Sequence, residues 1–135
     1  MRKTQNKVFS LKKLASSFHA AAQGMGQALR TEQNLRFHFI TALVVGILGL
    51  WLEISTIEWL LIVICIGFVI TVELLNTALE YLADVVRDEG RLNYAATKIP
   101  RDMAASAVLV SSLMAAGIGV AIFLPKLIEV IGAWF

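Results

Sequence analysis

A chain of 135 residues has the length of one domain, but 58% of its residues are apolar and its mean hydropathy is +0.73. This composition is too apolar for a soluble fold of that size and predicts an all-α integral membrane protein. The net charge of only +2 gives no indication of a nucleic-acid partner, and a single cysteine excludes a disulfide framework within the chain.

The first predicted element, residues 8–31, is an amphipathic helix that does not cross the membrane. Apolar side chains recur at steps of three and four residues from Phe9 to Leu29, while Lys12 and His19 fall on other faces. We expect this helix to lie on the membrane surface with its apolar side against lipid.

Three apolar stretches follow, and each is expected to cross the membrane as a helix of ~20 residues. The first reaches that length only by including His38 near one end, and the second continues past its apolar half as a polar cytoplasmic extension. The third carries no charged residue. The predicted transmembrane helices are residues 35–52, 57–86 and 103–125.

The stretch between the second and third transmembrane helices, roughly residues 87–101, is predicted to be a polar loop. Gly90, Asn93 and Pro100 are residues that commonly interrupt helices. Pro100 fits the first turn of the final helix, where its missing N–H costs nothing.

The distribution of Lys and Arg predicts which side of the membrane each segment faces. By the positive-inside rule, the segment before the first transmembrane helix and the loop before the third should be cytoplasmic, whereas the connection around Glu53 and Glu58 has no Lys or Arg. The N-terminus is therefore expected inside and the C-terminus outside, with Trp51, Trp59 and Trp134 in an outer aromatic belt. The basic residues are Arg2, Lys3, Lys7, Lys12, Lys13, Arg30 and Arg36 in the first segment, and Arg87, Arg91, Lys98 and Arg101 in the loop.

The second transmembrane helix carries a stripe of polar side chains. At ~100° per residue, Glu73, Asn76, Glu80 and Asp84 lie on one face, and the opposite face is apolar. Such a stripe cannot face lipid, because each charge near the bilayer centre is costly. It must therefore face partner helices, water or a ligand. A buried polar network that only holds helices together is the alternative interpretation.

Position along this helix separates the expected roles of the carboxylates. Glu73 and Glu80 lie seven residues apart, about 10 Å along the axis, too far for both to bind one metal ion. Glu73 is deeper, and a carboxylate in a low-dielectric site takes up a proton more readily, which suits a general base. Glu80 is nearer the cytoplasm and suits Mg²⁺, which prefers one or two carboxylates with phosphate oxygens and water. Asn76 can hydrogen bond between them.

Three motifs carry a resemblance to a known family over nearly the whole chain. They are Arg30-Thr31-Glu32-Gln33-Asn34, the segment from Glu73 to Glu80 with Asp84, and the segment from Lys98 through Arg101-Asp102 to Val108. Together they resemble the small prokaryotic diacylglycerol kinases, in particular their undecaprenol kinase branch. The resemblance implies a homotrimeric lipid kinase of the bacterial cytoplasmic membrane, which transfers the γ-phosphoryl group of MgATP to a lipid hydroxyl on the cytoplasmic side.

The resemblance also implies roles for particular residues. Glu73 matches the family's general base, and Asn76 matches the amide beside the reacting groups. Glu32 and Glu80 match the metal-binding carboxylates, and Asp102 matches the aspartate of the nucleotide site. Lys98 and Arg101 would face the phosphates. The expected nucleotide-binding residues are Glu32, Glu80, Lys98, Arg101 and Asp102.

Three positions depart from the family pattern. Arg101 stands where the family usually has Lys, so a planar fork replaces a compact ammonium. Ala20 stands where an aromatic residue is common, which removes one expected nucleotide contact. The segment between Asp84 and Asp102 is longer than the family pattern, so no site residue is expected from its middle.

Undecaprenol is the expected lipid acceptor, and diacylglycerol is the alternative. A small oligomeric proton-coupled transporter would use Glu73 as its protonation site, but it leaves Glu32, Glu80 and Asp102 without a shared task. A non-enzymatic membrane adaptor is the third possibility and predicts that Glu73→Gln leaves function intact.

Overall fold

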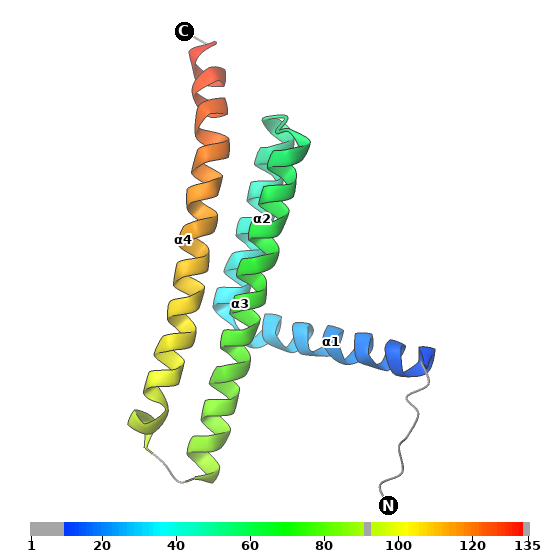
Figure 1. Cartoon of the computed structure of the whole chain (residues 1–135), viewed down its shortest axis with the longest axis vertical. Coiled ribbons are helices and arrows are strands. Elements are labelled where there is room, and N and C mark those ends of the chain that lie inside the picture. The colour runs from blue at the N-terminus through cyan, green and yellow to red at the C-terminus, as the bar shows by residue number, and fades with distance from the viewer. Residues whose placement is uncertain (1–9, 91–92, 134–135) are drawn as a thin grey trace, which may run out of the picture.

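The computed structural model describes residues 10–90 and 93–133 of the chain. Its helices α2, α3 and α4 run side by side along the long axis, and α1 leaves them at one side and points away (Figure 1). The expected start of the surface helix at residue 8 lies outside the described residues, as do Arg2, Lys3, Lys7, Arg91 and Trp134. The helices are α1 (Leu11–Thr31), α2 (Gln33–Trp51), α3 (Thr56–Glu89) and α4 (Tyr94–Gly132).

One residue, Glu32, forms the corner between α1 and α2. Its backbone is extended, with φ −97° and ψ 117°, and its N–H donates to the carbonyl oxygen of Ala28 at 2.8 Å. Glu32 therefore both ends α1 and precedes the first residue of α2. This corner redirects the chain from the direction of α1 into the bundle (Figure 1).

A tight turn joins α2 to α3 at the opposite end of the bundle. Ser55 and Glu58 form a capping box, in which Ser55 N–H donates to Glu58 Oε2 at 2.6 Å and Glu58 N–H donates to Ser55 Oγ at 3.3 Å. This reciprocal pair satisfies two backbone donors and fixes the start of α3. Glu58 also forms an ion pair with Lys126 of α4 at 3.6 Å.

The final helix begins earlier than the sequence predicted. The side chain of Asn93 accepts a hydrogen bond from Ala96 N–H at 3.1 Å and caps α4, which starts at Tyr94. Pro100 consequently lies inside α4 and not in its first turn, and α3 extends to Glu89. The helix α4 also continues through Pro125 to Gly132, beyond the predicted end at residue 125. The expected loop over residues 87–101 was too long, because Asn is a favoured N-cap and its capping outweighed the proline signal.

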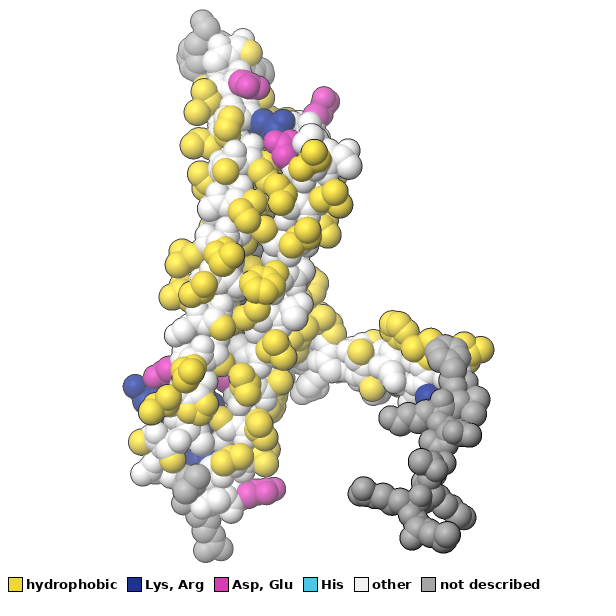
Figure 2. All heavy atoms as spheres, viewed as in Figure 1, with side chains coloured by type: hydrophobic (Ala, Val, Ile, Leu, Met, Phe, Trp, Pro, Cys, Tyr) yellow, Lys and Arg dark blue, Asp and Glu magenta, His cyan; other side chains and the backbone are white. Residues whose placement is uncertain are grey.

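The bundle buries few of its apolar side chains against one another. Helices α2, α3 and α4 are long and apolar enough to cross a membrane, yet no more than 17% of the most apolar window in each is buried within the chain. Figure 2 shows hydrophobic side chains along the middle of the bundle and charged ones toward its two ends. This is the surface of an all-helical, multi-pass membrane protein, as its composition predicted. The main buried cluster contains Leu52, Ile54, Ile62, Ile122 and Phe123.

Candidate active site

The polar stripe of α3 is buried within the molecule. Glu73 is only 2% exposed, Asn76 and Thr77 are each 6% exposed, and Glu80 is half-buried. These residues follow one another at helical spacing, so a single straight helix presents them on neighbouring lines of one face. The stripe therefore faces protein at this level of α3.

The α1–α2 corner brings a third carboxylate to this stripe. Glu32 and Glu80 are both close enough to Glu73 to repel its negative charge. Residues that are distant in sequence, on the corner and on α3, thus form one acidic cluster. Sequence periodicity alone linked Glu73 with Glu80, while Glu32 was expected there only from the family resemblance.

Several buried polar atoms of this cluster have no hydrogen-bond partner among the described residues. Asn76 Nδ2 donates to Glu80 Oε1 at 2.9 Å, but Asn76 Oδ1, Glu73 Oε2 and Thr77 Oγ1 are buried and unpartnered. Buried polar atoms are normally paired, so these atoms need a partner from outside the described residues, such as a ligand, water or a neighbouring molecule. Sequence reasoning missed Thr77, although its spacing of four residues from Glu73 was a usable signal.

The cluster is not a complete metal site by itself. Within residues 10–90 and 93–133, no group of three or more His, Cys, Asp or Glu side chains is arranged to hold a metal ion. Two carboxylates with oxygens from a substrate are nevertheless a usual ligand set for Mg²⁺. Glu32 and Glu80 are carboxylates of this kind, and each lies within electrostatic range of Glu73.

Asp84, further along α3, holds a second group of charges that joins α3 to α4. Arg101 Nη2 donates to Asp84 Oδ1 at 2.7 Å, and Arg87 Nη1 approaches the same oxygen at 2.9 Å. The Arg101 guanidinium also lies 5.5 Å from the centre of the Tyr94 ring. Arg101 is thus directed toward the polar face of α3, while its Nε atom is buried with no hydrogen-bond partner in the part of the chain that the structure describes.

Lys98 and Asp102 lie apart from these two groups. They form an ion pair with each other at 3.4 Å, and both side chains are largely exposed on α4. The ion pairs of the described residues do not connect them to Glu32, Glu73 or Glu80. The fold therefore brings together four of the seven predicted site residues, Glu32, Glu73, Asn76 and Glu80. Arg101 is linked to α3 through Asp84. No ion pair among the described residues links Lys98 or Asp102 to these groups.

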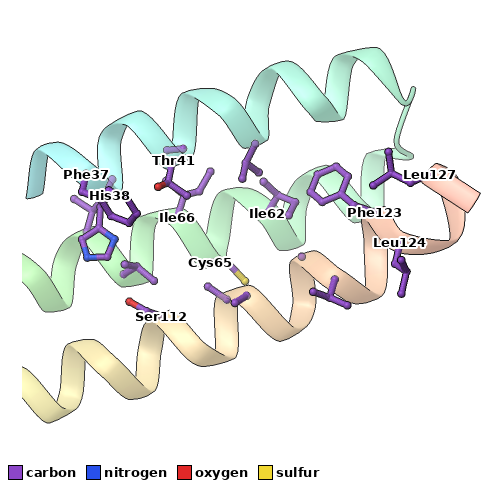
Figure 3. A pocket seen from close by; sticks show the side chains of 18 residues that line it. Phe37, His38, Thr41, Ile62, Cys65, Ile66, Ser112, Phe123, Leu124 and Leu127 are labelled. Atoms are coloured by element: carbon purple, nitrogen blue, oxygen red, sulfur yellow. The ribbon is translucent and has the colours of Figure 1, made fainter. Parts of the chain in front are cut away.

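A cavity of about 540 Å³ lies between α2, α3 and α4, one helical turn from the acidic cluster. On α3 its lining ends with Val69 and Ile70, just before Glu73. Most of the lining side chains are aliphatic or aromatic, as Figure 3 shows. The arrangement places a buried carboxylate at the edge of an apolar cavity, where an apolar molecule with a polar end could react.

Comparison with known proteins identifies relatives of this chain. The profile of the prokaryotic diacylglycerol kinase family matches residues 19–123. An undecaprenol kinase from Bacillus subtilis is 40% identical over 117 residues, which are 87% of this chain and 93% of that protein. A diacylglycerol kinase from Synechocystis sp. is 33% identical over 116 residues, covering 86% of this chain and 65% of that protein.

Proposed function

Because the chain belongs to the prokaryotic diacylglycerol kinase family, it is a lipid kinase, and we propose that its preferred acceptor is undecaprenol. The preference for undecaprenol over diacylglycerol is supported by the higher identity to the undecaprenol kinase. We further propose that the phosphoryl donor is ATP with Mg²⁺ and that the reaction takes place on the cytoplasmic side of the bacterial cytoplasmic membrane.

The observation that carries the mechanism is Glu73, a buried carboxylate with an unpartnered Oε2 atom beside an apolar cavity. In our proposal, Glu73 accepts the proton of the lipid hydroxyl as the hydroxyl oxygen attacks the γ-phosphorus atom. The new O–P bond forms, the bond to the β–γ bridging oxygen breaks, and ADP leaves with that oxygen. Asn76, with its buried and unpartnered Oδ1, orients the hydroxyl.

Glu32 and Glu80 would hold Mg²⁺ together with phosphate oxygens of the nucleotide. The metal supplies charge neutralisation at the phosphates, which is the main requirement of phosphoryl transfer. The hydrogen bond from Asn76 Nδ2 to Glu80 Oε1 fixes one of these carboxylates. The negative charges of Glu32 and Glu80 both repel that of Glu73, and a cation bound near Glu73 would relieve this repulsion.

Arg101, Lys98 and Asp102 would bind the nucleotide from α4. The Asp84 carboxylate holds one nitrogen of Arg101 and leaves other donors of the planar fork for a phosphate. Lys98 and Asp102 are exposed and, among the described residues, form an ion pair with each other. Their contribution therefore requires a nucleotide that reaches across α4, or a neighbouring subunit. We propose a homotrimer, in which a second chain brings these groups to the acidic cluster.

The first test is transfer of labelled phosphate from ATP to undecaprenol and to diacylglycerol in mixed micelles with Mg²⁺. We expect wild type to label undecaprenol faster and Glu73→Gln to lose at least about 100-fold in kcat, the range of a missing general base. Glu89→Gln is the matched control, because Glu89 is exposed at the end of the same helix. Equal labelling by Glu73→Gln and wild type would refute the assignment of the base.

The metal assignment has a separate test. Glu80→Gln and Glu32→Gln should both raise the Mg²⁺ concentration required for half-maximal activity, because each removes one carboxylate ligand. Removal of Mg²⁺ with a chelator should abolish transfer, and added Mg²⁺ should restore it. An unchanged Mg²⁺ requirement in both variants would place the metal elsewhere.

Diacylglycerol remains the second candidate acceptor, because the Synechocystis relative carries that activity in its name. Faster labelling of diacylglycerol than of undecaprenol would decide in its favour. The transporter and adaptor alternatives are not supported, because both relatives are kinases.

A further inference from the structure

We propose that the cavity between α2, α3 and α4 binds the single hydrocarbon chain of a polyprenol, with the hydroxyl end directed toward Glu73. This inference rests on the proposed function and makes the cavity the part of the molecule that selects the lipid chain.

The position of the cavity supports this assignment. Val69 lines it on α3, and Glu73 follows four residues later on the same face, which is about 6 Å along the helix axis. On α4 the lining runs from Ser112 to Leu127, a length of roughly 22 Å at 1.5 Å per residue. The cavity is therefore elongated, and one of its ends lies one helical turn from the acidic cluster.

The polarity of the lining changes along this length. His38, Thr41 and Ser112 lie toward one end, and Phe123, Leu124 and Leu127 lie toward the other (Figure 3). Ser112 Oγ is buried and has no hydrogen-bond partner among the described residues. The polar end is the one near Glu73. His38 lies close to the Glu32 corner at the start of α2, and Ser112 lies on the side of α4 toward Arg101, which contacts Asp84 of α3. This gradient matches an amphiphile with one hydroxyl and a long apolar chain.

The shape of the cavity suits an extended hydrocarbon chain. It has a volume of about 540 Å³ and runs for roughly 22 Å along α4. A polyprenol is a single chain with one hydroxyl at its end, so it can lie along this length with the hydroxyl at one end of the cavity.

Small residues on α4 keep the cavity open. Ala115, Ala116 and Gly119 line it, and a Cβ atom added to Gly119 would meet nothing within 4 Å. A large side chain at Gly119 can therefore enter the cavity without displacing backbone. Gly117 offers a matched control, because it also has open space around it but does not line the cavity.

The first experiment compares Gly119→Phe and Gly117→Phe in the kinase assay. We expect Gly119→Phe to raise the KM for undecaprenol at least tenfold, to leave the KM for ATP unchanged, and to affect a ten-carbon prenol much less. Gly117→Phe should resemble wild type. If Gly119→Phe and Gly117→Phe have the same KM for undecaprenol, the cavity does not hold the chain.

The second experiment needs no catalysis. Cys65 is the only cysteine of the chain and lines the middle of the cavity, so its alkylation by N-ethylmaleimide reports on occupancy. Undecaprenol, without nucleotide, should slow alkylation at least fivefold, and diacylglycerol should not. The variant Cys65→Ala controls for background labelling.

These two readouts separate the inference from the function on which it rests. Unchanged alkylation in the presence of undecaprenol, together with normal kinase activity, overturns the cavity assignment alone. Equal protection by diacylglycerol overturns the selection of a single chain. Absence of phosphate transfer to any lipid overturns the proposed function, whatever the alkylation rates are.

Discussion

At the scale of single residues, Asp84 determines the position of Arg101. Family resemblance predicted a phosphate contact for Arg101, but it did not predict that the guanidinium is held on α3 by Asp84 and beside the ring of Tyr94. The register between α3 and α4 creates this pairing, and a single sequence does not encode that register in any local pattern. Arg101 is thus both a packing residue and a nucleotide-binding candidate.

Asp84→Asn should therefore affect folding and nucleotide binding together. The variant removes the charged acceptor and leaves Arg101, which is mostly buried, with weaker compensation of its charge. We expect the variant to have a lower Tm in detergent and a higher KM for ATP than the wild-type protein has.

Asp88→Asn is the control for this prediction, because Asp88 is more exposed and pairs with Arg87 of its own helix. A Tm and a KM for ATP that are equal in the two variants would show that the Asp84–Arg101 contact has no role in either property.

The residues of the acidic cluster show which parts of the site could be predicted from the sequence. Helical periodicity predicted that Glu73, Asn76 and Glu80 share a face, since periodicity depends only on local geometry. Glu32 needed the family resemblance, because its position depends on the corner that ends α1. The unpartnered atoms and the cavity could not be predicted, since both depend on how three helices pack.

At the scale of helices, the turn between α2 and α3 depends on close packing at Gly49. A Cβ atom at this position would lie 2.9 Å from the Trp59 ring and 3.0 Å from Ile54 Cδ1. Glycine is therefore required for the close approach of the two helices at this end. Together with the capping box of Ser55 and Glu58, this contact fixes where α3 starts.

Gly49→Ala should destabilise the protein by about 1–3 kcal/mol, the usual effect of adding an atom to a packed site. Gly46→Ala, on the same helix, has open space around the added Cβ and should be neutral or stabilising by up to ~1 kcal/mol. Thermal unfolding in detergent, followed by circular dichroism, measures both. A Gly49→Ala variant as stable as Gly46→Ala would show that the Trp59 ring moves aside freely.

The order of the helices could be predicted from the sequence, but the end of α3 and both ends of α4 could not. The apolar runs predicted three membrane-crossing helices because their length and composition are set by the bilayer. The start of α4 was misplaced because a side-chain cap by Asn93 competed with a proline signal at Pro100. Such competition between local signals is decided by tertiary structure.

At the scale of the whole molecule, most apolar surface lies outside the chain's own core. A membrane is the environment that suits this surface, because the described helices cover only a small part of one another. Three crossings place the start of α2 and the end of α4 on opposite sides of the membrane. Basic residues predict that the N-terminal side is cytoplasmic.

Cysteine labelling tests this orientation. In a Cys65→Ala background, Glu53→Cys in the α2–α3 turn should react with a membrane-impermeant maleimide added to intact cells, and Gly90→Cys after α3 should react only after lysis. Both positions are exposed in the structure, so differences in labelling report the side of the membrane. The reverse pattern would invert the topology and place the acidic cluster outside.

The continuous helix α3 has a further consequence. Its 34 residues span about 51 Å, well beyond the ~30 Å hydrocarbon thickness of a bilayer. The capping box anchors one end of this rod, and Glu73 lies at a fixed distance from it. A thicker or thinner bilayer would therefore change the depth of Glu73 relative to the lipid headgroups, or tilt the helix. The reaction rate should then depend on the acyl length of the host lipid. It should be highest where the hydrocarbon thickness of the bilayer matches the length of α3 between the capping box and Glu73.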